Sequence, residues 1–151
     1  MDKAGSIERP PVDHAVTLLA VGSDEEDLFR LRSICGGTGW LLQEAPTLQA
    51  AVAQMEQNAI PVVLCQRNLR DGDWTALLAA ADRLREPPFL IVWSRQVDKS
   101  LCAEVLNLGG HDVLVAPLRV VEVVHAVSAA VRKWRQQGSG GAQLPPQAPA
   151  A

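Results

Sequence analysis

Short apolar runs alternate with amphipathic segments along most of the chain. The runs cover residues 15–21, 40–45, 60–66, 89–93 and 111–116. Each run is short, and turn-forming residues follow most of them, so we expect five strands. The run at 60–66 is apolar up to its last residue, Gln66, which is typical of a strand buried on both faces of a parallel sheet.

The segments between and after these runs place apolar residues at helical spacing. The first expected helix begins in the acidic stretch 24–27 and ends at Gly36-Gly37, and Thr47 can cap the second. The third ends before Pro87-Pro88, and Gly109-Gly110 closes the fourth. The buried stripe expected for the last helix is Val120, Val124, Val127, Val131 and Trp134.

Alternating strands and helices with short connections predict an α/β fold. We expect a flavodoxin-like, doubly wound sheet of five parallel strands in the order 2-1-3-4-5, with helices on both faces. Residues 1–14 are expected to be a flexible leader, residues 15–137 one domain, and residues 138–151 a disordered tail of glycine, proline and alanine.

Composition narrows the functional classes. The formal net charge of -3 gives no electrostatic case for binding nucleic acid or an anionic membrane. No apolar run approaches the roughly 18 residues of a membrane span, and no secretory signal is visible, so we expect a cytoplasmic protein. Cys35, Cys65 and Cys102 are too far apart for a metal site, and we expect reduced thiols. His111 and His125 have no acid or cysteine at ligand spacing.

Three segments resemble the receiver domains of two-component response regulators, over roughly residues 15–136. Residues 69–73, Leu-Arg-Asp-Gly-Asp, are similar to the family's Leu-Pro-Asp-Gly-Asp turn. Residues 108–117 are similar to its Leu-Gly-Ala-Asp-Asp-Tyr-Leu-Val-Lys-Pro segment, and residues 18–21 with the acidic turn match its first strand and loop. The resemblance implies the CheY-like version of the flavodoxin-like fold.

The resemblance also implies which positions would carry phosphoryl transfer. A phosphorylatable receiver has an aspartate after its third strand, two acids that hold Mg²⁺ after the first, a hydroxyl after the fourth and a lysine after the fifth. Gln66 stands at the aspartate position, Gly22 and Ser23 at the acid pair, Trp93 at the hydroxyl and Ala116 at the lysine. We therefore expect a degenerate pseudo-receiver that has no enzymatic activity, no cofactor and no metal.

Nearby acids leave one alternative open. A shift of one register would bring Asp24 and Glu25 to the acid pair and allow a weak cation site, although a helix start also explains them. Asp71 and Asp73 lie in the loop and are interpreted as turn formers. The second hypothesis is a receiver that retains phosphorylation or cation binding through an atypical residue.

Two tryptophans and one proline are also unusual at this expected rim. Trp93 and Trp74 either fill the space that phosphate and metal would take or anchor a partner; we favour filling for Trp93 and leave Trp74 open. Ala116-Pro117 matches the family's Lys-Pro bond, and we expect it to be cis because the loop geometry requires it.

The leading hypothesis is a stand-alone receiver-like domain that acts in signalling by binding a protein without phosphorylation. Its expected surface is the fourth helix, fifth strand and fifth helix, about residues 98–108, 111–116 and 119–136, meeting a signalling protein or a second copy. Arg119, Arg132, Lys133 and Arg135 give the last helix a basic side. No output domain is expected after Gln137. A nucleotide- or flavin-binding domain is the rival, although no glycine-rich phosphate loop follows the first strand.

Overall fold

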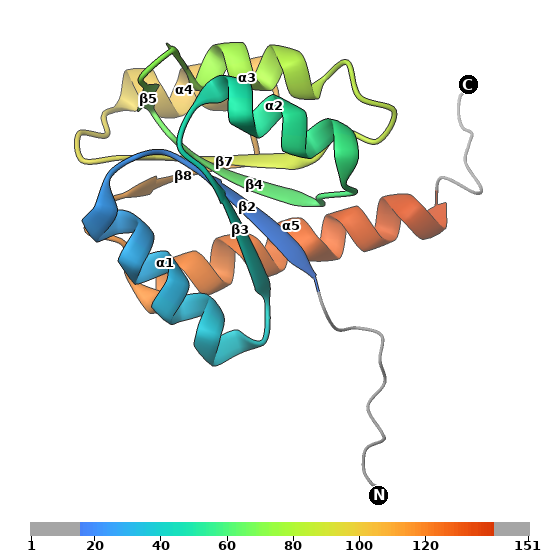
Figure 1. The fold of residues 1–151 in the computed structure, drawn as a ribbon, viewed down its shortest axis with the longest axis horizontal. Helices are drawn as coiled ribbons and strands as arrows, with labels where there is room; N and C mark the ends of the chain where they lie inside the picture. The colour runs from blue at the N-terminus through green and yellow to red at the C-terminus, as the bar shows by residue number, and fades with distance from the viewer. Residues whose placement is uncertain (1–15, 141–151) are drawn as a thin grey trace, which may run out of the picture.

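The computed structural model describes residues 16–140, with the side chains of residues 16–137. Strands and helices alternate through the described part of the chain (Figure 1). Their bounds are β2 Thr17–Val21, α1 Glu25–Thr38, β3 Leu41–Ala45, α2 Leu48–Gln57, β4 Val62–Gln66, β5 Asn68–Leu69, β6 Gly72–Asp73, α3 Trp74–Ala81, β7 Phe89–Ser94, α4 Lys99–Leu108, β8 Asp112–Val115 and α5 Val120–Gly140. The predicted leader and residues 141–151 of the predicted tail lie outside the described residues.

The main sheet has five parallel strands in the order β3-β2-β4-β7-β8. Counting these strands along the chain gives 2-1-3-4-5, so the predicted order is confirmed. Helices α1 and α5 cover one face of the sheet, and α2, α3 and α4 cover the other (Figure 1). The arrangement is the doubly wound, flavodoxin-like fold.

Alternate residues of the strands build two cores, one on each side of the sheet. Leu18, Leu64 and Ile91 belong to the core under α1 and α5. Leu19 and Val63 belong to the core under α2, α3 and α4. Residues 62–65 are all at most 1% exposed, so the prediction that the central strand is buried on both faces is confirmed.

The ends of two helices differ from the prediction. Helix α1 does not end at Gly36-Gly37 but continues to Thr38, and Gly39 ends it in the left-handed conformation with φ of 85°. Glycine weakens a helix without forbidding it, whereas a positive φ strongly favours glycine. Helix α5 continues to Gly140, so residues 138–140 of the predicted tail are helical.

The buried stripe of α5 also differs from the prediction. Val120 is 58% exposed, and the face that packs on the sheet is centred on Val123, Val127 and two alanines, Ala126 and Ala130. Val127 and Val131 of the predicted stripe are buried and Val124 packs against the core, whereas Val120 lies outside the buried face. The prediction that Val120 is buried is therefore wrong.

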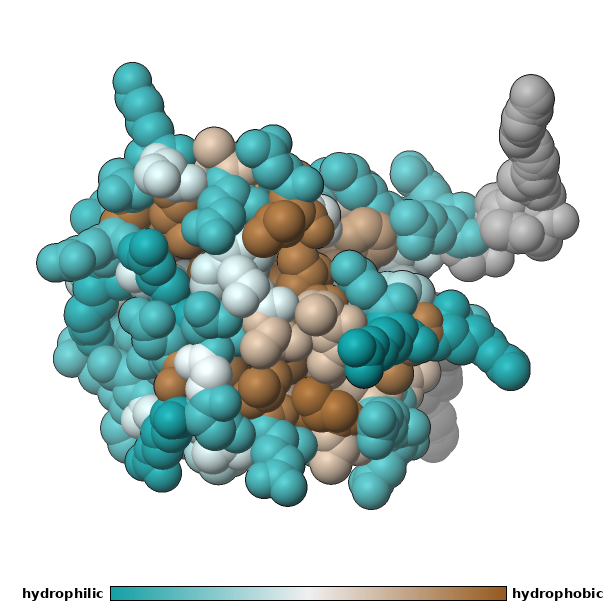
Figure 2. Space-filling view, turned by 90° about the horizontal axis from the view of Figure 1, so that it is seen from above, coloured by the Kyte–Doolittle hydropathy of each residue, from teal (hydrophilic) through white to brown (hydrophobic). Residues whose placement is uncertain are grey.

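The face that carries α2, α3 and α4 is partly apolar. Helix α3 has the sequence WTALLAAA, and both its core side and part of its outer side are apolar. Figure 2 shows this face of the molecule from above, with apolar residues in the middle and polar residues around them. Within residues 16–140, none of the helices combines the length and the apolarity needed to span a membrane.

Candidate functional site

The carboxyl ends of the strands bring the sequence-predicted site residues together. Gln66 pairs with Trp93 in the register of β4 and β7, and Gly22 directly follows Val21, which pairs with Cys65. Ala116 follows β8, and its backbone N–H donates to the carbonyl of Ser94. These four positions belong to one edge of the sheet, which we call the rim.

The Gln66 side chain is fixed by the loop that follows β2. Its Oε1 accepts hydrogen bonds from the backbone N–H groups of Ser23 at 3.1 Å and Asp24 at 3.2 Å. A Cβ atom on Gly22 would stand 2.5 Å from this Oε1 and 2.9 Å from the Cβ of Gln66. Glycine at position 22 therefore leaves the space that the glutamine occupies.

The Trp93 side chain is buried at the rim. Its side chain is 0% exposed and belongs to the core under α1 and α5. Its indole Nε1 donates to Oδ2 of Asp27 at 3.0 Å. Asp27 is itself only 2% exposed, and this burial raises the pKa of its carboxyl group.

Arg95, in the loop between β7 and α4, supplies the positive charge at the rim. Its guanidinium lies 3.1 Å from Asp27 Oδ1, 3.3 Å from Asp24 Oδ2 and 3.9 Å from Glu26. Asp24 is also the N-cap of α1 and accepts the backbone N–H of Asp27, which is the main reason why its pKa is lowered. The single positive charge of Arg95 therefore offsets part of the negative charge at the start of α1.

The alternative pair for a cation, Asp24 and Glu25, does not converge on the rim. Glu25 pairs with Arg32 at 3.2 Å, while Asp24 pairs with Arg95. Arg32 also holds Glu44 of β3, which lowers the pKa of that carboxyl group. Within residues 16–140, no group of three or more histidine, cysteine or acidic side chains is placed to hold a metal ion.

A shallow hollow of about 230 Å³ opens at the rim. Three segments of the chain line it. They are the start of α1 with Asp24 and Asp27, the end of β4 and the residues after it with Gln66, Arg67 and Asn68, and the end of β7 and the residue after it with Trp93, Ser94 and Arg95. Arg67 donates to the backbone carbonyl of Gln96 at 3.3 Å. The hollow thus has two carboxylates and two guanidinium groups.

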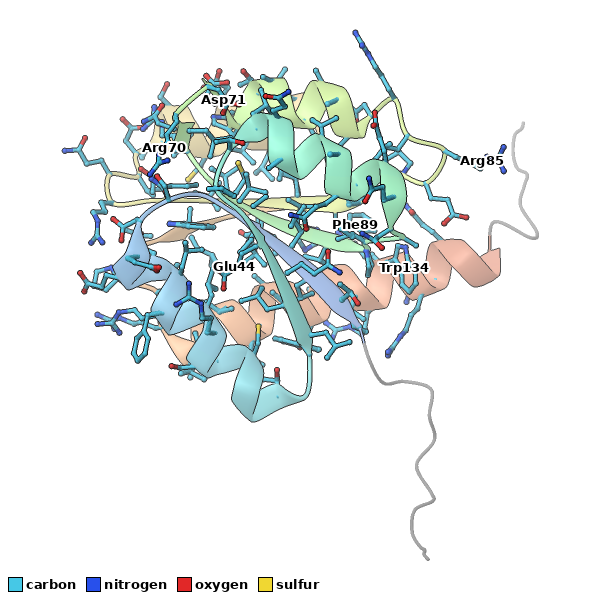
Figure 3. The ribbon with its side chains drawn as sticks, viewed as in Figure 1. Glu44, Arg70, Asp71, Arg85, Phe89 and Trp134 are labelled. Carbon is cyan, nitrogen blue, oxygen red and sulfur yellow. The ribbon has the colours of Figure 1, made fainter. Side chains whose placement is uncertain are left out.

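The loop acids Asp71 and Asp73 do more than form turns. Both carboxylate oxygens of Asp71 accept backbone N–H groups at the start of α2, Leu48 at 2.7 Å and Gln49 at 3.0 Å. Asp73 is the N-cap of α3 and accepts from the Thr75 backbone at 3.0 Å and its hydroxyl at 2.6 Å. Figure 3 shows Asp71 at the opposite end of the sheet from Phe89 and Trp134.

The remaining predicted residues divide into buried and exposed groups. Trp74 is 2% exposed, so its side chain offers no surface to a partner, and the anchoring interpretation of this residue is wrong. Arg119, Arg132 and Lys133 are exposed on or beside α5. The bond between Ala116 and Pro117 is cis, so this prediction is confirmed.

The positions of the cysteines and of His111 give no indication of a catalytic or metal-binding role. Burial raises the pKa of the Cys35 thiol to about 11, and burial raises that of Cys65 further. Cys102 is half-buried, and all three thiols are free. His111 packs edge-on against Phe89, and burial lowers its pKa.

Sequence reasoning missed the partnership of Asp27, Trp93 and Arg95. The available signal was the position of Asp27 on α1: Leu31 and Ile34 follow it at spacings of four and seven and are buried. An acid on the buried stripe of a helix requires a partner. The sequence does not show that this partner comes from a loop after the fourth strand of the sheet.

Comparisons with known proteins agree on the fold. No family model matches the sequence, and no curated protein matches it. A CheY-like receiver domain from Methanospirillum hungatei superposes with a TM-score of 0.74 at 20% identity, covering 82% of this chain and 99% of that one. A two-component response regulator from Clostridium difficile gives 0.70 at 19% identity, covering 78% and 97%. The beryllofluoride-activated NtrC4 receiver domain dimer gives 0.73 at 19% identity, covering 78% and 98%. The chain has the fold of response-regulator receiver domains.

Proposed function

We propose that this chain is a degenerate receiver domain that takes up no phosphoryl group and acts in signalling by binding another protein. The observation that carries the proposal is Gln66, which stands at the end of the central strand with its Oε1 bound to two backbone N–H groups. A neutral carboxamide lacks the negative oxygen that attacks phosphorus. The nucleophile of the receiver reaction is therefore absent from its expected place.

The residues around Gln66 support the same conclusion. Gly22 has no space for an acidic side chain, because even a Cβ atom would lie within 2.9 Å of the Gln66 Cβ. Ala116 offers no positive charge for phosphoryl oxygens. The buried indole of Trp93 fills the position where a hydroxyl would bind those oxygens. Phosphoryl transfer depends on positioning and charge stabilisation, and these positions supply neither.

Exposed apolar residues on α4, β8 and α5 support a role in protein binding. Leu106, Leu108, Val115 and Val121 are between 46% and 79% exposed. A hollow of about 430 Å³ beside Val115 and Val121 is lined by residues 112–115, 121, 122 and 125. Apolar surface of this kind favours protein contacts, and the basic residues Arg119, Arg132 and Lys133 are also exposed on or beside α5. The partner is a signalling protein or a second copy of the chain; the NtrC4 receiver domain, which shares the fold, forms a dimer.

Phosphorylation is tested by incubating the protein with acetyl phosphate and Mg²⁺ and measuring its intact mass. We expect no gain of a phosphoryl group, whereas a phosphorylatable receiver treated in parallel gains one. Gln66→Asp is the matched variant and is also expected to stay unmodified, because the other positions still lack their chemistry. A mass gain in the natural protein would refute the proposal, and a gain in the variant would show that the rest of the rim is competent.

Protein binding is tested on the same surface with matched substitutions. Val121→Glu, on α5, should abolish concentration-dependent self-association in sedimentation or the recovery of a specific partner from cells. Leu41→Glu is the control, because Leu41 is 54% exposed but lies on β3, at the opposite edge of the sheet. Equal behaviour of the two variants would exclude this surface.

A further inference from the structure

We propose that Arg95 is a positioning residue that latches the start of α1 to the loop between β7 and α4 and so holds the Trp93 indole in place. The latch consists of Arg95, Asp24, Glu26, Asp27 and Trp93. Its members come from the start of α1, with the residue before it, and from the end of β7, with the loop that follows it. The latch itself does not depend on the proposed function; only its consequence for a partner does.

Asp27 is the centre of the latch. One of its carboxylate oxygens accepts the Trp93 indole N–H at 3.0 Å, and the other accepts the Arg95 guanidinium at 3.1 Å. The carboxylate is 2% exposed, so water does not replace either donor readily. A buried carboxylate is stable only while both charge and hydrogen bonds are satisfied.

Arg95 also offsets repulsion at the start of α1. Asp24, Glu26 and Asp27 lie within four residues of one another, and the same guanidinium nitrogen approaches all three. A guanidinium group stays charged across the physiological range and can donate several hydrogen bonds from one plane. A neutral side chain at position 95 would leave three carboxylates facing one another, which favours separation of the two loops.

The latch connects the rim to α4. Three residues after Arg95, Asp98 caps α4 by accepting the backbone N–H of Leu101 at 2.9 Å. The loop between them also accepts a hydrogen bond from Arg67 at the Gln96 carbonyl, and its Val97 packs against the core under α2, α3 and α4. Opening the latch therefore loosens the loop that leads into α4, and under the proposed function α4 belongs to the partner surface.

Arg95 is separate from the core that keeps the domain folded, whereas the Trp93 indole belongs to the core under α1 and α5. The sheet and both cores are built from apolar residues of the strands and helices, and Arg95 is outside them with its side chain 47% exposed. Loss of Arg95 should therefore open the two loops locally while the domain stays folded.

The experiment follows the indole N–H signals of the protein labelled with ¹⁵N. The sequence has 4 tryptophans, and the Trp93 signal is identified by its absence in Trp93→Phe. In the natural protein this N–H should exchange slowly with solvent. In Arg95→Gln we expect exchange about tenfold faster, as for the loss of a charge-assisted hydrogen bond next to a buried group. Backbone exchange should also rise over residues 22–28 and 94–101.

Arg67→Gln is the matched control, because it removes the other guanidinium of the same hollow without touching the carboxylates. It should leave the Trp93 indole signal and its exchange unchanged. Unchanged exchange in Arg95→Gln, or equal changes in both variants, would refute the latch. If Arg95→Gln does not fold, Asp24→Asn tests the same idea by removing one partner of Arg95, and it should raise loop exchange by a smaller factor. No result of this experiment depends on whether the protein is phosphorylated or binds a partner.

Discussion

Gly22→Ala tests whether the Gln66 side chain and the loop after β2 fit together as tightly as the structure indicates. The new Cβ atom would lie 2.5 Å from Gln66 Oε1 and 2.9 Å from Gln66 Cβ. The amide could swing away, but the Gln66 Cβ is fixed to the backbone of a buried strand. The substitution therefore forces a shift of the loop or the strand, and overpacking of this kind costs about 1–3 kcal/mol.

A double-mutant cycle with Gln66→Ala measures the interaction free energy between positions 22 and 66. Gln66→Ala alone loses two hydrogen bonds to the backbone of Ser23 and Asp24. Because Ser23 is exposed, water can replace part of this loss, and we expect a cost of about 1 kcal/mol. In Gly22→Ala the amide must already leave these two hydrogen bonds, so Gln66→Ala adds little further cost and the combined loss should be smaller than the sum by about 1 kcal/mol, while the contact with the Cβ of residue 66 remains.

Urea unfolding of the four proteins measures these terms, with an unchanged m-value as evidence that the unfolded state is unaffected. Gly36→Ala is the matched control, because a Cβ there meets nothing within 4 Å. Gly36 lies inside α1, so alanine should stabilise the protein by about 0.5–1 kcal/mol. If Gly22→Ala is as stable as the natural protein, or if the two losses simply add, the packing argument fails.

Three further predictions concern single side chains. Trp93→Phe should cost about 2–4 kcal/mol in urea unfolding, because it removes a hydrogen bond to a buried carboxylate and leaves a small cavity; a cost below that of Gln66→Ala would contradict this. Asp73→Ala should cost about 1 kcal/mol, because α3 loses its N-terminal cap. The pKa of Asp73 is lowered in the fold, mainly by its hydrogen bond to Thr75. The stability that Asp73 contributes should therefore fade as pH falls below 3.8. The pH dependence expected for Asp27 runs in the opposite direction. Its pKa is raised in the fold, so the folded state binds the proton more tightly than the unfolded state. The stability of the natural protein relative to Asp27→Asn should therefore fall as pH rises from 3.8 through the raised pKa. A flat difference over that range would show that the Asp27 carboxyl is not perturbed.

The fold could be predicted because the sequence carries strong local signals. Five apolar runs and the turn residues between them fix the strands, and the sheet order follows from the general rules of such folds. The errors lie where local signals compete. Gly36-Gly37 resembles a helix end, but Gly39 takes the left-handed conformation that ends α1. The valines of α5 resemble one buried stripe, but Val120 is exposed, and Ala126 and Ala130 are buried beside Val127 and Val131.

The sequence could predict which residues lie at the candidate site, but not which of their side chains contact one another. Gln66 and Gly22 were placed at the rim from the ends of their strands and from the family resemblance. Their mutual fit is a matter of ångströms between two loops, and no sequence pattern encodes it. The same holds for Trp93 and Asp27, which are 66 residues apart in the chain and joined by one hydrogen bond. Only the register of β4 and β7 brings that indole under the start of α1.

The charges at the rim suggest why function would move to another surface. In a phosphorylatable receiver, as the resemblance implies, acidic side chains at the rim are balanced by a bound cation, and the phosphoryl group adds further charge. Here Asp24 and Asp27 are paired with Arg95, and the position of the acceptor carboxylate holds the neutral amide of Gln66. Arg95 is thus already engaged by side chains of the rim, and an anionic ligand would compete with three carboxylates for its guanidinium group. A ligand can shift a conformational equilibrium only by the difference between its affinities for the two conformations. For a ligand at the rim, that difference is reduced by the free energy needed to break the latch. Under the proposed function, a signal would therefore reach this domain more easily through the exposed apolar residues of α4, β8 and α5 than through the rim.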